Sequence, residues 1–210
     1  MKSTTREHKM VLKGLLSRQK ILEVKPDSYL QNIIENNYIH DWMEDLWTYC
    51  HATRLPDEVA YTSFQIYTNF VNLKPRDFVQ SRWSSHACIW IACKLFFDHP
   101  FRVKAMVERV KGKVSHRKLK KYVRKLVKNE TRIVTELKYE FHKPTALDFV
   151  NTLVPLLKLP PKSRTVKEIM EKLKLFTNSH ITSPPVELAV HSILAVTPQL
   201  SEQVHSLVES

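Results

Sequence analysis

The chain has 210 residues, 43% of them hydrophobic, and a formal net charge of +12 at pH 7. This apolar share predicts a folded protein and excludes a disordered polar chain. Glycine occurs only twice, at Gly14 and Gly112, whereas average usage would give about fourteen, and antiparallel sheets depend on glycine in their turns. The composition therefore predicts an all-α fold, in one domain or two small lobes.

Taken in chain order, the sequence predicts helices that are separated by Pro, Asn and Asp. The segment 1–27 is a basic lead-in with a short helix near 9–20, and Pro26-Asp27-Ser28 is a capping signal for a helix of about ten residues. Apolar residues at helical spacing and proline breaks predict the remaining helices. These are expected at 38–53, at 58–72, from beyond Pro75 to near 98, at 115–139, from 145, at 165–178, at 184–196 and in the tail.

Several kinds of function are not expected from this sequence. No stretch approaches about eighteen consecutive apolar residues, and the first twenty residues lack the apolar core of a signal peptide, so we expect an intracellular protein without a membrane partner. The odd number of cysteines, Cys50, Cys88 and Cys93, favours free buried thiols. Neither a metal-ligand spacing, nor a glycine-rich phosphate loop, nor a nucleophile motif is present, so we expect no metal, no cofactor and no enzymatic activity.

The positive charge is concentrated in one region. Residues 102–128 contain twelve Lys or Arg against the single Glu108, a net charge of +11. This basic strip is either a solvated helix face or an electrostatic surface for nucleic acid or an acidic protein. Its candidate anion or nucleic-acid contacts are Arg117, Lys118, Lys121, Arg124 and Lys125.

Two charged residues interrupt apolar helix faces. Lys94 follows Trp83, Ala87 and Ile91 along one face in the segment around "HACIWIACKLFF". Glu130 occupies a core-side position in the stripe of Leu119, Val123, Leu126, Ile133 and Leu137. Because an unpaired buried charge costs several kcal/mol, the two should pair with each other, lie at the rim or meet a partner. The alternative is that both side chains extend to water from the ends of apolar faces.

Three motifs follow one another along the chain: "ENNYIHDWMEDL" with Asp41 and Trp42, "IACKLFF" with Ala92 and Lys94, and a third that begins at Glu130. In this order they resemble the cyclin box, the five-helix lobe by which cyclins bind cyclin-dependent kinases. The first motif is similar to the first-helix pattern M-R-x-x-L-x-D-W-L, and the second is similar to A-x-K-F-E-E. The fifth-helix pattern is the most specific match. Its residues here are Glu130, Leu137, Tyr139, Phe141, Pro144, Thr145 and Phe149.

The resemblance implies a cyclin-box lobe over 28–149, preceded by a basic extension at 1–27 and followed by a truncated second helical lobe at 150–210. It also implies that Lys94 and Glu130 contact the mobile C helix of a kinase. The protein would then be a nuclear or also cytoplasmic regulatory subunit that forms a heterodimer with the kinase and does no chemistry itself, in cell-cycle or meiotic crossover control. Asp41, Trp42, Ala92, Leu137, Tyr139, Pro144 and Thr145 would be structural.

The chain also departs from the family pattern. Asn36 and Thr68 replace an arginine and an aspartate that buttress the box, and Phe96 and Phe97 replace the acidic pair after the lysine. These two aromatics either pack inside, the alternative favoured here, or enlarge an apolar docking surface for the kinase. The alternative function is a cyclin-fold scaffold that binds nucleic acid, like a general transcription factor, through the basic strip.

Overall fold

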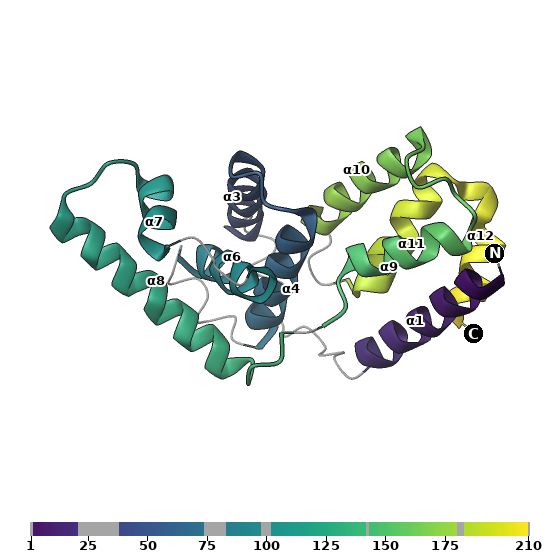
Figure 1. The fold of residues 1–210 in the computed structure, drawn as a ribbon, viewed down its shortest axis with the longest axis horizontal. Helices are drawn as coiled ribbons and strands as arrows, with labels where there is room; N and C mark the ends of the chain where they lie inside the picture. The colour runs from purple at the N-terminus through teal and green to yellow at the C-terminus, as the bar shows by residue number, and fades with distance from the viewer. Residues whose placement is uncertain are drawn as a thin grey trace. The chain divides into compact units, whose positions relative to one another are not determined.

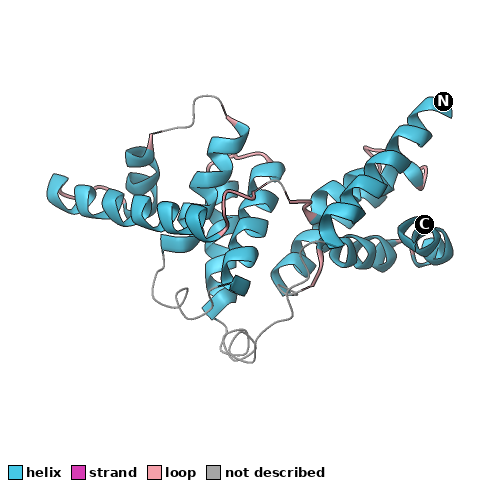
Figure 2. Ribbon diagram, turned by 90° about the horizontal axis from the view of Figure 1, so that it is seen from below, coloured by secondary structure: helices cyan, strands magenta, loops and turns pink. Residues whose placement is uncertain are grey.

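A computed structural model of the protein describes residues 2–20, 38–73, 83–97, 102–141, 143–179 and 183–209. The chain divides into two compact units, one formed by Pro26–Phe141 and the other by Met1–Lys25 together with His142–Ser210 (Figure 1). All regular structure in the described ranges is helical and none of it is a strand (Figure 2). The all-α prediction is therefore confirmed, while the helix expected after Pro26-Asp27-Ser28 lies outside the described residues.

The unit Pro26–Phe141 is built around one buried helix. In its described part the helices are α3 (Tyr38–Ala52), α4 (Asp57–Leu73), α6 (Trp83–Phe96), α7 (Val103–Lys111) and α8 (His116–Glu136). Helix α6 contacts α3, α4 and α8, and every residue from Trp83 to Cys93 is buried. Four small residues of α6 have no exposed surface, which lets its neighbours approach closely: Ala87, Cys88, Ala92 and Cys93.

Aromatic and aliphatic side chains fill the space between α6 and its neighbours. On α4, Tyr67 and Phe70 are almost fully buried, and on α3 Met43 and Leu46 have no exposed surface. Because these side chains cover α6 on several sides, its all-round apolar sequence is satisfied within the unit.

Helices α7 and α8 form a hairpin closed by a glycine. Gly112 ends α7 with a φ of 68°, a left-handed conformation that glycine adopts without a Cβ clash. Helix α8 then starts after Ser115, as predicted, and ends at Glu136, three residues earlier than expected. Lys138 and Tyr139 adopt positive φ values of 51° and 63°, so the backbone leaves the right-handed helical region before Tyr139.

The second unit joins the two ends of the described chain. It contains α1 (Lys2–Lys20), α9 (Ala146–Leu156), α10 (Arg164–Ser179), α11 (Pro185–Val196), the 3₁₀ turn η1 (Pro198–Leu200) and α12 (Ser201–Glu209). Helix α1 lies against α9, and α11 contacts both α9 and α10. The side-chain oxygen of Gln19 accepts a hydrogen bond of 3.1 Å from the backbone N–H of Val186, which ties α1 to the start of α11.

These units differ from the expected domain boundaries. The segment 1–27 was expected to be an extension, yet α1 is longer than the predicted 9–20 helix and buries Leu12 within the second unit. The expected boundary at 149 falls inside α9, whereas the units divide after Phe141. Burial of the apolar side of α1 against α9 is the physical reason, and it adds a helix to the lobe that was expected to be truncated.

Candidate functional site

The charged pair expected from the sequence is present at the surface of the unit Pro26–Phe141. The Lys94 ammonium, in the last turn of α6, donates to Glu130 Oε1 on α8. Trp90, one turn earlier on α6, donates from Nε1 to the other carboxylate oxygen of Glu130 at 3.1 Å. The Lys94 ammonium also lies 5.1 Å from the centre of the Trp90 ring. The three side chains therefore form one cluster. Lys94 and Glu130 pair with each other, which is one of the arrangements that the sequence left open.

Burial is unequal within this cluster. The Glu130 side chain is 15% exposed and that of Lys94 is 42% exposed, while Trp90 is buried. Two bonds from α6 fix the glutamate on the inner side, where a bare carboxylate would be costly. The lysine presents the outer, water-accessible part of the pair.

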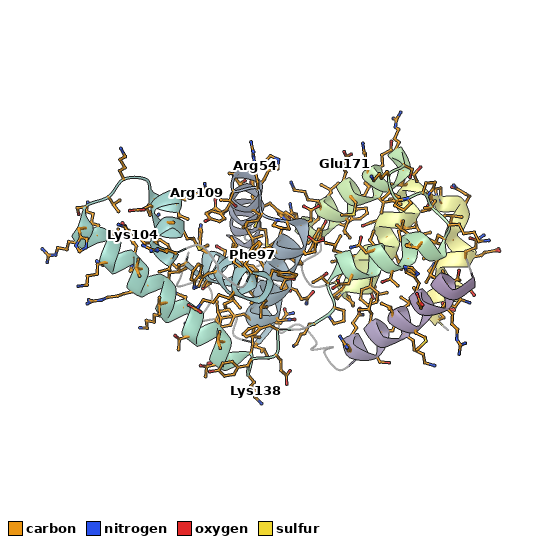
Figure 3. All side chains as sticks on the ribbon, in the orientation of Figure 1. Arg54, Phe97, Lys104, Arg109, Lys138 and Glu171 are labelled. Atoms are coloured by element: carbon orange, nitrogen blue, oxygen red, sulfur yellow. The ribbon has the colours of Figure 1, made fainter. Side chains whose placement is uncertain are left out.

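Apolar side chains lie beside the cluster at the end of α6. Phe96 is 48% exposed and Leu95 is 37% exposed, and half-buried Phe97, labelled in Figure 3, follows the last residue of the helix. The expectation that the two phenylalanines pack inside is wrong for Phe96. Helix α6 leaves its covering neighbours after Cys93, so the residues that follow reach the surface.

The remaining predicted cyclin-box residues fall in both units. Ala92 and Leu137 are buried and Tyr139 is 73% exposed in the first unit, while Pro144 and Thr145 are buried at the start of α9 in the second. Asp41 and Trp42 belong to α3, but their side chains lie outside the described part.

Thr145 has a local role in addition to its burial. Its hydroxyl accepts from the backbone N–H of Asp148, and the Asp148 carboxylate accepts from the backbone N–H of Thr145. This reciprocal capping box confirms the predicted start of a helix at Thr145.

The candidate anion contacts of the basic strip lie on the exposed side of α8. Arg117, Lys118, Lys121, Arg124 and Lys125 are all exposed, and Lys104 and Arg109, labelled in Figure 3, lie on α7. Glu108 forms an exposed ion pair with Lys104 at 3.7 Å. Leu119 and Leu126 are buried on the other side of α8, so the strip is separated from the core by the width of one helix.

Sequence reasoning missed a set of contacts along the seam between α6 and α8. The rings of Trp83 and Tyr122 lie 5.4 Å apart with planes tilted by 30°, and the Lys111 ammonium is 5.7 Å from the Trp83 ring centre. Farther along, the Ser84 hydroxyl donates to the Asn129 side-chain oxygen at 3.3 Å. The only sequence signal for these contacts was that Tyr122 and Asn129 of α8 carry polar groups. Their presence does not show which residues of α6 they contact.

The three cysteines are free and buried, as expected. Burial raises the pKa of the Cys50 and Cys93 thiols from an ordinary 9.0 to about 12 and raises that of Cys88 as well. Thiols in this state are neutral and poorly nucleophilic near pH 7. Within the described ranges, no group of three or more His, Cys, Asp or Glu side chains is placed to hold a metal ion.

Comparisons with known proteins do not assign a family. The sequence matches no model of a protein family, and the search of curated proteins gave no match. Among the helices that the structure describes, none is long and apolar enough to cross a membrane.

Proposed function

We propose that this protein is a cyclin-like regulatory subunit that binds the catalytic subunit of a cyclin-dependent kinase through the unit Pro26–Phe141. In this proposal the protein does no chemistry itself, and it either activates the kinase or recruits it in cell-cycle or meiotic crossover control within the nucleus. The cluster of Lys94, Glu130 and Trp90 is the contact site. Leu95, Phe96 and Phe97 provide apolar surface beside it.

The observation that carries the proposal is the surface ion pair of Lys94 and Glu130 at the end of the buried helix α6. In the cyclin box, which the sequence resembles, residues at these two positions contact the kinase. The arrangement has the physical properties of a docking site, because a polar pair lies beside exposed apolar side chains. The five described helices of the unit, with α6 in the middle, are compatible with the same resemblance.

The proposed mechanism is a shift between two states of the kinase. A protein kinase is inactive until the glutamate of its C helix pairs with the lysine that holds the ATP phosphates. A subunit that binds the active placement of the C helix more tightly raises the population of that placement. The shift cannot exceed the difference between its affinities for the two states. A contact site fixed to the most buried helix of the unit suits this task, because it keeps one geometry while the kinase moves.

The test is capture of purified cyclin-dependent kinase catalytic subunits by the full chain, followed by measurement of phosphate transfer to a peptide. We expect at least one kinase to bind wild-type protein, and Lys94→Ala and Glu130→Gln to weaken that binding. Glutamine is used at position 130 because its amide oxygen can still accept from Trp90 Nε1, which keeps the fold intact. Phe96→Ser should weaken binding by removing apolar contact area.

A matched control exists in the same unit. Lys104 and Glu108 form another exposed Lys–Glu pair, on α7, so Lys104→Ala and Glu108→Gln change the same charges at a different place. The control variants should capture kinase as wild type does. If folded wild-type protein captured no kinase, the proposed function would fail. If the Lys94 and Glu130 variants bound as tightly as the control variants, the contact site would be wrong.

A further inference from the structure

Helix α8 carries a second surface, which lies apart from the cluster of Lys94, Glu130 and Trp90. Residues 109–129 contain ten Lys or Arg and no acidic residue. Seven of these cations lie on α8, and every one is exposed: Arg117, Lys118, Lys120, Lys121, Arg124, Lys125 and Lys128. On the helix surface Arg117, Lys121, Arg124 and Lys128 lie opposite the buried stripe of Leu119, Leu126 and Ile133. The other three cations, Lys118, Lys120 and Lys125, lie on the flanks of the helix. An extended face of one sign results, on the side of α8 opposite the core.

Four of these cations form a straight column. Arg117, Lys121, Arg124 and Lys128 follow one another at spacings of four, three and four residues, which places them on the same face of an α-helix. At about 1.5 Å of rise per residue the column is about 16 Å long. Each strand of duplex DNA presents a phosphate about every 3.4 Å along the axis, so the column faces about five phosphates per strand.

These positive charges destabilise helix α8. The first turn of α8, where the helix dipole favours acidic side chains, has none. Like charges also recur at i and i+4, as in Arg117 with Lys121 and Lys121 with Lys125, and such pairs repel. Glu130, the nearest acidic residue along α8, is bound to Lys94 and Trp90. An external polyanion would remove this repulsion.

The composition of the face selects the kind of polyanion. Protein interfaces need apolar or aromatic anchors at their centre, and single-stranded nucleic acid is held by stacking on exposed aromatic rings. The outward column contains neither. Tyr122, the aromatic residue within 116–136, packs against Trp83 on the seam with α6. Charge without anchors fits the backbone of a duplex, which is bound through its phosphates without reading the bases.

We propose that the outward face of α8 binds the phosphate backbone of duplex nucleic acid without sequence preference. This inference does not depend on the proposed kinase binding, because the column and Glu130 lie on different sides of α8. The same helix would allow a kinase and a duplex to be bound together, so that the regulatory subunit carries the kinase to nucleic acid.

The experiment measures fluorescence anisotropy of a labelled 20-base-pair duplex of mixed sequence with the full-length protein between 50 and 200 mM NaCl. With four to seven phosphates neutralised, the slope of log K against log salt should lie between about −4 and −6. The test variant carries Arg117→Gln, Lys121→Gln, Arg124→Gln and Lys128→Gln. It should bind at least about tenfold more weakly at 100 mM salt, with a slope closer to zero by about 3.6.

The matched control removes the same charge elsewhere. Lys9→Gln, Lys13→Gln, Lys162→Gln and Lys167→Gln also remove four exposed positive charges, all in the other unit, and this variant should bind as wild type does. Circular dichroism should show equal helix content for both variants. Equal binding of the duplex by the two variants would overturn the proposal, and so would a slope near zero for the wild-type protein. Tighter binding of a single strand of the same length would also overturn it, as would binding of poly-glutamate but not of the duplex.

Discussion

Helices α6 and α8 touch along their length but are built in opposite ways. Helix α6 is buried on all sides from Trp83 to Cys93, whereas the buried residues of α8 are Leu119, Leu126 and Ile133. Helix α6 is a central buried helix with a short exposed end. Helix α8 has a narrow apolar stripe on one side and a broad charged face on the other. From this comparison we expect α6 to determine the stability of the unit, and we propose that α8 supplies surface for partners.

Helices α6 and α8 are joined by hydrogen bonds to one side chain, Glu130. Trp90 and Lys94 of α6 hold Glu130 of α8, which is a charged residue on the apolar stripe. If stability and surface function are divided between the helices in this way, substitutions on α6 and α8 should differ in their effects. All four tryptophans of the sequence lie in the unit Pro26–Phe141, so tryptophan fluorescence during urea unfolding reports on this unit.

The largest effect is expected in the middle of α6. Ile89 has no exposed surface, so Ile89→Ala should lower the free energy of unfolding by about 2–5 kcal/mol through lost burial and the cavity that remains. The control is Val127→Ala on α8, where the side chain is 42% exposed and a change below about 0.5 kcal/mol is expected. Similar losses for the two variants would remove the contrast between the helices.

A smaller effect on the free energy of unfolding is expected where Trp90 and Lys94 of α6 contact Glu130 of α8. Trp90→Phe removes the Nε1 donor from the mostly buried Glu130 carboxylate and should cost about 1–3 kcal/mol. Lys94→Met removes the exposed partner and should cost less than about 1 kcal/mol, because solvent weakens exposed ion pairs. Urea unfolding followed by circular dichroism measures both changes. A larger cost for Lys94→Met would mean that the lysine, not the tryptophan, anchors the glutamate.

The buried thiols predict a pH dependence. Because burial raises the pKa of Cys50 and Cys93 from 9.0 to about 12, the folded state keeps these thiols neutral where the unfolded chain ionises. Their contribution to stability is complete below pH 9.0 and is lost as the pH rises toward 12. Iodoacetamide at pH 8 should leave the native protein unmodified and alkylate all three cysteines in urea. Rapid alkylation of native protein, measured by mass spectrometry, would contradict the burial of these thiols.

The smallest effect is expected on the outward face of α8. Replacing Arg117, Lys121, Arg124 and Lys128 with glutamine should leave the free energy of unfolding within about 0.5 kcal/mol of wild type or raise it slightly, because repulsion between like charges is relieved. The same variant should lose duplex binding. A large loss of stability would show that these cations support the fold and are not free for a partner.

Local features of the fold could be predicted from the sequence. Proline breaks, capping residues and helical spacing predicted the starts of α8 and α9 and most of the helices between 38 and 209. The assignment of α1 could not be predicted, because its partner α9 lies more than a hundred residues away and an apolar stripe does not identify what covers it. The segment 1–27 therefore looked like an extension, although Leu12 is buried in the second unit.

The candidate site could be predicted in part, because charged residues interrupt the apolar stripes of two helices. Lys94 and Glu130 each interrupt an apolar stripe, and the cost of burying them apart predicted that they would pair, lie at the rim or meet a partner. The structure shows the first of these arrangements. The third member, Trp90, was not predictable, since its sequence context is uniformly apolar and its indole N–H has no signature. The exposure of Phe96 was missed for a related reason. Hydrophobicity alone does not show where a buried helix emerges from its neighbours.

The distance along the chain between α1 and α9 has a consequence for protein synthesis. Residues 21–145, which number 125, must be added after α1 before α9 begins, and at about 5–20 residues per second this takes about 6 to 25 seconds. The contiguous unit Pro26–Phe141 can fold during that interval, while Leu12 of α1 has no native cover. The first described helix to leave the ribosome is therefore among the last to reach its final place, and a chaperone that recognises amphipathic helices has that interval in which to bind it.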